Sequence, residues 1–324
     1  MPACSPSVVT YYAIPDDYRI IKNRESVVNK YSHYLKGRII FIDPGHGGDD
    51  RKNVGSLGLA VEADVNLRVG LALRDLLKKA GATVVMSREK DESIDIYERT
   101  ELANFSKADI FISIHHNATG YPYDRSLNYT ATFYHADESS YNFEPCNKDI
   151  ARYIQRDLAF AMGNSGGPDS FDGTYPDKYI IPEMGIAVLR DAKIPAVLLE
   201  CGFHSSPFEE KRLIEPEFNQ LQAWGIFKGL GRYFEAGVPE IKFISKTVND
   251  SPGSELIYQL KDRTGIDPSS IRVYLNSKPI EYNYDPASGQ ISLIAPEKTA
   301  AENVIRIICA NIKGNHSFPF YDKQ

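Results

Sequence analysis

Short apolar runs alternate with amphipathic stretches between residues 37 and 236, and this alternation constrains the fold more than any other feature of the chain. Runs at 38–43, 83–87, 109–114 and 196–200 have the length of buried strands, and helical periodicity fills most of the sequence between them. Parallel strands that are covered on both faces read as nearly continuous apolar runs. The pattern therefore predicts an α/β fold, with a mostly parallel sheet and helices on both of its faces.

The amphipathic stretches predict helices at 62–80, 97–106, 149–162 and 217–235, and a further strand is expected at 132–134. The first helix has a broad apolar face and is followed by Gly81, which is a common residue just beyond a helix end. Its apolar face consists of Leu67, Leu71, Leu73, Leu76 and Leu77.

The pattern changes after Pro239, where helical periodicity largely disappears. Short candidate strands separated by Gly, Pro, Asn and Asp turns predict a small all-β sandwich domain; they lie at 241–245, 255–261, 270–275, 291–294 and 303–310. We therefore expect three parts: an N-terminal leader segment at 1–36 packed on the main domain, an α/β domain at 37–237, and the β domain at 238–324.

Composition excludes several classes of function. The chain has 42% hydrophobic and 25% charged residues, as ordinary globular proteins do. A formal charge of −6 gives no footprint for nucleic acid or an anionic membrane. The sequence has no run of about 18 apolar residues, so it predicts no transmembrane segment.

The cysteines and the N-terminus carry little information about chemistry. Four cysteines are widely scattered without the spacing of a disulfide framework or a cysteine zinc site. Residues 1–5 lack the apolar core of a signal peptide. The Ala-Cys-Ser at 3–5 is compatible with a trimmed lipoprotein attachment site, which would make Cys4 a lipid anchor, or with a plain surface cysteine.

Ionisable side chains follow three of the predicted strands. His46 follows the first strand, His115 and His116 follow the third, and Glu200 follows the apolar run of the late strand. Glu62 opens the helix after the first strand. Since the carboxyl ends of parallel strands lie at one edge of a sheet, we expect these groups to converge there. Two imidazoles and one carboxylate form a common ligand set of hydrolytic zinc sites. A second glutamate would then serve as general base.

Each of these residues also has a plainer interpretation. A lone histidine after a glycine turn is commonly a surface loop residue, and an acid in the first turn of a helix is favoured by the helix dipole. His115 and His116 are compatible with one core and one exposed histidine. Glu200 is harder to dismiss, because a carboxylate directly after four apolar residues is costly to bury without a partner.

The motifs resemble those of the zinc-dependent N-acetylmuramoyl-L-alanine amidases, the cell-wall hydrolases typified by AmiA, AmiB and AmiC. The matching segments are IDPGHGG (42–48), EADVNL (62–67), SR (87–88), ERTELAN (98–104), ADIFISIHHNA (108–118) and PAVLLECGF (195–203). The resemblance implies a peptidoglycan hydrolase that cleaves the amide between the lactyl group of N-acetylmuramic acid and L-alanine. It implies one Zn²⁺ on His46, Glu62 and His115, with Glu200 catalytic. The strand pattern leaves His115 and His116 equivalent, and the family motif selects His115.

Residues around these four have weaker assignments. Asp43 is a candidate acceptor for an imidazole N–H, Arg88 a support for the fold or the site, and His116 and Asn117 candidates for contact with substrate or with the ligands. Two positions depart from the family pattern, since His116 stands where a small residue is common and His204 where an aromatic residue or leucine is common.

Segment 118–148 is longer than a turn, and in some relatives an insertion in this region blocks the site until a partner protein displaces it. The resemblance thus implies peptidoglycan as substrate, allows an activator protein, and suggests a periplasmic, envelope or secreted location. It also suggests an immunoglobulin-like C-terminal domain. The alternatives are another zinc-dependent cell-wall peptidase or deacetylase, and a non-catalytic cell-wall-binding protein.

Overall fold

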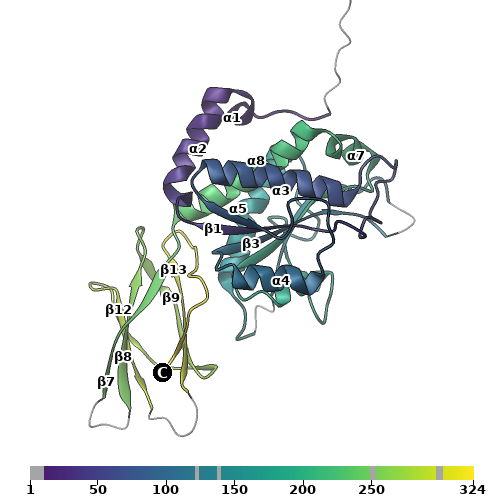
Figure 1. Ribbon diagram of the computed structural model, residues 1–324. Helices are drawn as coiled ribbons and strands as arrows, with labels where there is room; N and C mark the ends of the chain where they lie inside the picture. The colour runs from purple at the N-terminus through teal and green to yellow at the C-terminus, as the bar shows by residue number, and fades with distance from the viewer. Residues whose placement is uncertain (1–10, 121–123, 137–139, 249–252, 297–301) are drawn as a thin grey trace, which may run out of the picture.

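The computed structural model describes residues 11–120, 124–136, 140–248, 253–296 and 302–324. An α/β body with helices on both faces of a sheet is joined to a C-terminal β domain (Figure 1). The predicted fold class is confirmed. Cys4, the candidate lipid anchor, lies outside the described residues.

The central sheet has six strands in the order β2-β1-β3-β6-β4-β5. Strands β1, β2, β3 and β6 are parallel, and β4 runs antiparallel to β6 but parallel to β5. The strands are β1 (Ile39–Pro44), β2 (Thr83–Met86), β3 (Ile110–Asn117), β4 (Thr130–Tyr134), β5 (Thr174–Pro176) and β6 (Ala196–Phe203). Because β1, β3 and β6 are adjacent and parallel, their carboxyl ends form one continuous edge.

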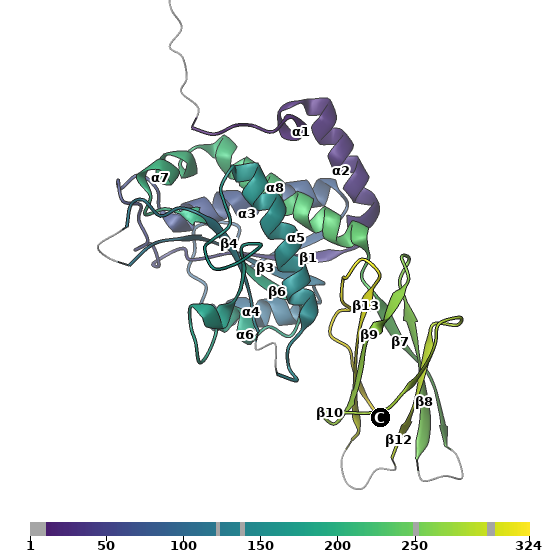
Figure 2. The same ribbon diagram turned by 180° about the vertical axis from the view of Figure 1, so that it is seen from behind.

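Side chains that alternate along each central strand enter two different cores. Ile40 and Ile42 of β1 pack toward α3, α5 and α8, whereas Phe41 between them packs toward α4 and α6. The helices are α3 (Glu62–Lys79), α4 (Ile96–Phe105), α5 (Pro145–Met162), α6 (Ala187–Arg190), α7 (Pro207–Leu213) and α8 (Pro216–Ala236). Figure 2 shows α5 beside α8 on one face and α4 with α6 on the other. This two-sided burial explains why the strands read as continuous apolar runs.

The N-terminal helices α1 (Asp16–Arg19) and α2 (Ile21–Leu35) pack against α8 (Figure 1). Tyr31 of α2 lies edge-to-face on Phe227, and a Cβ at Gly231 would lie 2.3 Å from the Tyr31 ring, so the helices approach closely there. Asp17 accepts a hydrogen bond from the Trp224 indole and pairs with the buried Lys228. Among the described residues, no helix combines the length and apolar character that a membrane span requires.

The C-terminal domain consists of two four-stranded antiparallel sheets, ordered β10-β9-β13-β14 and β11-β12-β8-β7. Alternate residues of the strands face each other in one apolar core, which includes Tyr258, Ile291 and Ile307. The strands are β7 (Glu240–Val248), β8 (Ser254–Lys261), β9 (Ile266–Leu275), β10 (Lys278–Pro279), β11 (Asn283–Asp285), β12 (Gln290–Ala295), β13 (Val304–Asn311) and β14 (Tyr321–Lys323).

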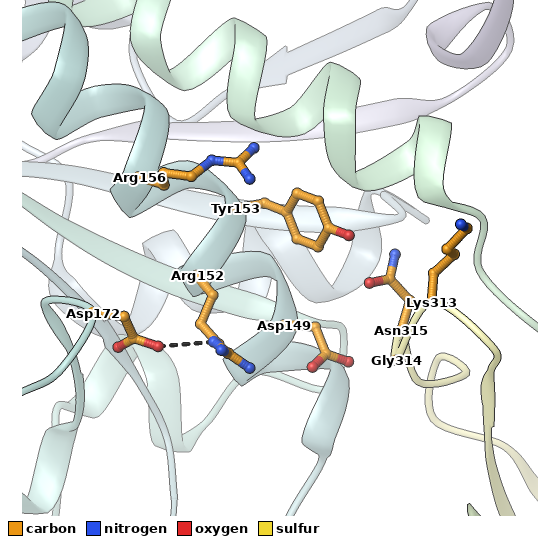
Figure 3. A pocket seen from close by; sticks show the side chains of 8 residues that line it. All are labelled: Asp149, Arg152, Tyr153, Arg156, Asp172, Lys313, Gly314 and Asn315. Carbon is orange, nitrogen blue, oxygen red and sulfur yellow. Dashed lines mark ion pairs between the residues drawn. The ribbon is translucent and has the colours of Figure 1, made fainter. Parts of the chain in front are cut away.

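Polar contacts join the β domain to the ends of α5 and α8. The Asn315 side chain donates to the Tyr233 and Gly237 carbonyls, and the His316 backbone N–H donates to Asp149 at 2.8 Å. Beside these contacts, a cavity of about 400 Å³ separates α5 from the loop at 313–315 (Figure 3).

Arg306 of β13 is the most deeply buried charge at this joint, with 1% of its surface exposed. Its guanidinium donates to the Phe143 carbonyl at 2.7 Å and pairs with Glu144 at 2.9 Å, directly before α5. The rings of Tyr141, Tyr274 and Tyr321 surround it at 4.8–5.9 Å from their centroids. One buried cation thus connects both parts of the chain.

We expect Arg306→Ala to lower the free energy of unfolding by about 3 kcal/mol, because it leaves Glu144 without its buried partner. Urea unfolding followed by the fluorescence of Trp224, the single tryptophan, measures this change. Lys323→Ala is the control: it removes an exposed ion pair with Glu302 and should change stability by less than about 0.5 kcal/mol. Equal effects of the two substitutions would contradict the role of Arg306.

Candidate active site

His46 lies in the loop that follows β1, and it has a left-handed backbone with φ of 60°. Non-glycine residues adopt this conformation rarely, and where they do, surrounding contacts hold it in place. Gly45 before it allows the His115 ring to approach, since a Cβ on Gly45 would lie 2.2 Å from that ring. The glycine before His46 therefore reflects the close approach of the His115 ring to the backbone of this loop.

Two arginines hold the His46 loop by its carbonyl groups. Arg88 donates to the carbonyls of Pro44, Gly45 and Ala63 at 2.7–2.9 Å, and Arg99 donates to those of Pro44 and His46 at 2.9 and 2.8 Å. Both guanidinium groups are almost completely buried. Burial, aided by the positive charge of Arg99, lowers the pKa of Arg88 to about 10. Arg88 thus supports the site through the backbone.

Asp43 has a different role from the imidazole acceptor that the sequence suggested. Its buried carboxylate accepts hydrogen bonds from Arg99 and Ser87, both at 2.6 Å, and from Ser113 at 2.8 Å. Asp43 lies on the face of β1 that α4 covers, so it binds Arg99 of that helix. The carboxylate that contacts His46 Nδ1 is Asp50, at 2.7 Å.

His46, Glu62 and His115 come together at the carboxyl edge of the sheet. Glu62 Oε2 lies 3.2 Å from His46 Nε2, and Glu62 Oε1 lies 3.1 Å from His115 Nδ1. One nitrogen or oxygen from each residue lies within 4.8 Å of the others. Two imidazole nitrogens and a carboxylate oxygen at this spacing can hold a divalent cation such as zinc.

The charges of this cluster are strongly coupled. Burial alone would lower the pKa of His46, but its hydrogen bonds with Glu62 and Asp50 outweigh burial and raise the pKa to about 9. Burial alone would raise the pKa of Glu62, but its contacts with His115 and His46 hold the pKa well below its usual value. Glu62 is therefore a carboxylate at neutral pH, and it favours a positive charge beside it.

Glu200 lies beside His115, because the register of β3 and β6 pairs these two residues. Alternation along the strands directs both side chains to the same face of the sheet. The Glu200 Oε2 atom is buried and has no hydrogen-bond partner among the described residues. Burial and the negative charge of Glu62 raise the pKa of Glu200 well above its usual value. A carboxyl group with a buried, unpartnered oxygen and a raised pKa is suited to proton transfer.

His116 points away from this cluster, into the core between α3 and α8. Its Nδ1 lies 2.7 Å from Asn66 Oδ1, and its Nε2 lies 2.8 Å from Gln222 Nε2. Burial lowers its pKa to about 3, so the ring is neutral. The two positions that strand periodicity left equivalent are thus distinguished, since His115 lies beside Glu62 and His116 beside Gln222.

Asn117, the other candidate for contact with substrate, stabilises its own loop. Its side-chain oxygen accepts from Ala118 N at 2.8 Å, and its carbonyl accepts from His204 N at 2.9 Å. After Asn117 the chain forms β4, and the described residues between β3 and α5 contain no helix. A blocking helix is therefore absent from the described part of segment 118–144.

Three polar residues near Glu62 were not assigned from the sequence. Asp50 and Asn53 follow His46 in the same loop, and the Asn53 amide donates to Glu62 Oε2 at 2.7 Å. His204 was recognised as unusual but given no role; it is buried, and its Nε2 lies 3.8 Å from Glu62 Oε2. The only sequence signal was a cluster of polar residues after the glycines.

Gly45→Ala should displace the His115 ring and lower the free energy of unfolding by about 1–3 kcal/mol, because the added methyl overlaps the ring. Urea unfolding measures the free energy, and the NMR signals of the histidine rings report the displacement. Gly120→Ala is the matched control, because a Cβ there meets no atom within 4 Å. Unchanged His115 signals in Gly45→Ala would contradict the predicted overlap.

With a chelator present, the stability that His46 contributes should fall as pH rises. The folded-state pKa of about 9 exceeds the unfolded value of about 6.5, so this contribution is complete below about pH 6.5 and is lost as pH rises through 9. We therefore expect the difference in unfolding free energy between the wild type and His46→Gln to shrink between pH 6.5 and 9. A constant difference over this range, measured by urea unfolding, would rule out the charged pair.

Comparison with known proteins identifies the family of the chain. Residues 40–232, more than half of the chain, match the Amidase_3 model, described as N-acetylmuramoyl-L-alanine amidase. The germination-specific N-acetylmuramoyl-L-alanine amidase of Bacillus subtilis is 34% identical over an alignment of 220 positions, and the match covers 63% of this chain and 84% of that protein.

Solved structures give the same assignment. An N-acetylmuramoyl-L-alanine amidase of Clostridium difficile is 30% identical, with a TM-score of 0.53 over 61% of this chain and 97% of that one. The CwlD amidase of Clostridioides difficile, solved in complex with the GerS lipoprotein, is 28% identical, with a TM-score of 0.52 over 61% of this chain and 99% of that one. The chain belongs to the N-acetylmuramoyl-L-alanine amidase family.

Proposed function

We propose that this protein is a zinc-dependent N-acetylmuramoyl-L-alanine amidase that hydrolyses peptidoglycan at the amide between the lactyl group of N-acetylmuramic acid and L-alanine. The observation that carries the proposal is the convergence of His46, Glu62 and His115 beside Glu200, whose Oε2 atom is buried. Membership of this family supports the assignment of the bond that is cleaved.

The residues present fit a zinc ion. His46 would bind through Nε2, since Asp50 occupies its Nδ1, and His115 through Nδ1, the atom that faces Glu62. An imidazole whose other nitrogen contacts a carboxylate is the usual arrangement in zinc sites. Three protein ligands leave a position free for water or substrate, and zinc held there would lower the pKa of that water and polarise the scissile carbonyl.

Glu200 would act as general base and then as general acid. It accepts a proton from the attacking water and returns it to the nitrogen of L-alanine as the amide breaks. The raised pKa makes this carboxylate a stronger proton acceptor than an exposed glutamate. Its buried, unpartnered Oε2 is the atom available for the proton.

The remaining parts of the chain are assigned less directly. We propose that residues 37–237 form the catalytic domain, preceded by the leader segment at 1–36, and that residues 238–324 form an immunoglobulin-like domain that spaces or targets it. Peptidoglycan as substrate implies an envelope or extracellular location. A lipoprotein is a candidate activator, because a related amidase was solved in complex with one.

Glu200→Gln should retain bound zinc and lose about 10²–10⁴-fold in hydrolysis of purified sacculi, because it removes the proton acceptor. His46→Ala should lose zinc as well as activity. Metal analysis and release of soluble muropeptides measure the two quantities, and Glu101→Gln, an exposed change on α4, should preserve both. Full activity of Glu200→Gln would exclude its catalytic role.

Mass spectrometry of the digest separates the alternatives. An amidase releases stem peptides that begin with L-alanine and leaves glycan strands intact. Cleavage within the stem peptide would indicate a peptidase, and loss of acetyl groups a deacetylase. Binding without any product would indicate a cell-wall-binding protein.

A further inference from the structure

The two oxygens of Glu62 are held by different parts of the chain. Oε1 accepts from the backbone N–H of His116 at 3.0 Å, and the Asn66 amide lies 3.4 Å from it. Both of these donors belong to the sheet and to α3, so the core fixes them. Oε2 depends on the loop between His46 and Glu62, where the Asn53 amide donates to it at 2.7 Å.

Asn53 contacts Glu62 through its backbone as well as its side chain. The Glu62 backbone N–H donates to the Asn53 carbonyl at 2.9 Å, directly at the start of α3. These two hydrogen bonds together fix the position of the Asn53 side chain relative to the Glu62 carboxylate. The amide nitrogen also lies 3.2 Å from His46 Nε2, so Asn53 lies beside two of the three candidate ligands.

The loop that carries Asn53 is itself rigid. Residues Val54 and Val61 form an antiparallel bridge, and the buried Glu210 carboxylate accepts backbone N–H bonds from Leu57, Leu59 and Ala60 at 2.5–3.0 Å. A Cβ at Gly55 would lie 2.0 Å from Glu210, so the loop closes tightly over this carboxylate. Asn53 is therefore held in place before any ligand binds.

We propose that Asn53 is a positioning residue that fixes the orientation of the Glu62 carboxylate for metal binding. The inference rests on the proposed zinc site. Without the amide, Oε2 keeps only its close contact with His46 Nε2, and the donors to Oε1 alone orient the carboxylate when His46 binds a metal. The donor to a charged carboxylate is the stronger of the two Asn53 contacts, since it is charge-assisted and shorter than the contact with His46. Loss of the amide should therefore lower the affinity of the site for a metal ion.

Zinc affinity of the full-length protein tests this role without relying on activity. Metal-free wild type, Asn53→Ala and Lys52→Ala are titrated with zinc in competition with a chromophoric chelator. We expect Asn53→Ala to bind zinc about tenfold more weakly, as is typical when a partner of a metal ligand is removed. Lys52→Ala, an exposed change in the same loop, should bind as the wild type does. Equal or tighter binding by Asn53→Ala would overturn the proposal.

A second measurement separates positioning from a merely structural effect. Cobalt replaces zinc, and its visible absorption bands report the number and geometry of its ligands. Asn53→Ala should alter these bands while the metal-free protein keeps the melting temperature of the wild type. Should the alanine variant fail to fold, Asn53→Ser gives the same comparison, with binding expected to be weaker than wild type. Unchanged bands and affinity would overturn the role of Asn53.

The outcomes also separate this inference from the proposed function. If the wild type and Asn53→Ala bind zinc equally well, only the positioning role is contradicted. A wild type that binds no zinc contradicts the proposed zinc-dependent amidase itself.

Discussion

The carboxylate of Glu62 is the group on which the candidate site depends. It is 2% exposed, and a buried carboxylate is stable only with charged or hydrogen-bonding partners. Its partners come from four separate segments: His46 and Asn53 from the loop after β1, His115 and the His116 backbone from β3, Asn66 from α3, and His204 from the loop after β6. The partners of this one carboxylate thus come from segments more than 150 residues apart in the sequence. A cation bound in the site would neutralise the remaining negative charge.

Around this charge, the scaffold controls geometry through the backbone. Arg88 and Arg99 bind carbonyls of the His46 loop, and Glu210 binds amides of the loop before Glu62. These three charged side chains are buried, so their bonds are shielded from water and more directional than surface contacts would be. The ligand-bearing loops are therefore held by ionic groups that do not themselves contact the candidate cation site, which leaves the ligands free for chemistry.

Much of this arrangement was predictable from sequence, because it follows from periodicity. Apolar runs predict β1, β2, β3 and β6, and the rule that parallel strands end at one edge predicts that His46, Glu62, His115 and Glu200 converge. The prediction that Asp43 accepts from an imidazole was wrong, because the sequence does not show that Arg99 of α4 contacts its carboxylate. Asn53 and Asp50 were missed because irregular loops lack a period from which side-chain direction can be read.

The sequence by itself determined the α/β class, the positions of β1, β2, β3 and β6, and the residue types that gather at the sheet edge, since each depends on local patterns of hydrophobicity and turn residues. The strand ends were less well determined, because β3 and β6 continue to Asn117 and Phe203, beyond the expected ends at 114 and 200. Strand periodicity leaves His115 and His116 equivalent, and their different surroundings in the structure depend on which face of β3 meets α8. Only the tertiary structure decided that Glu200 lies beside His115, because strand register is a non-local property. The partners of Glu62 likewise lie on loops held by hydrogen bonds between residues far apart in the sequence. A local stretch of sequence does not predict such bonds.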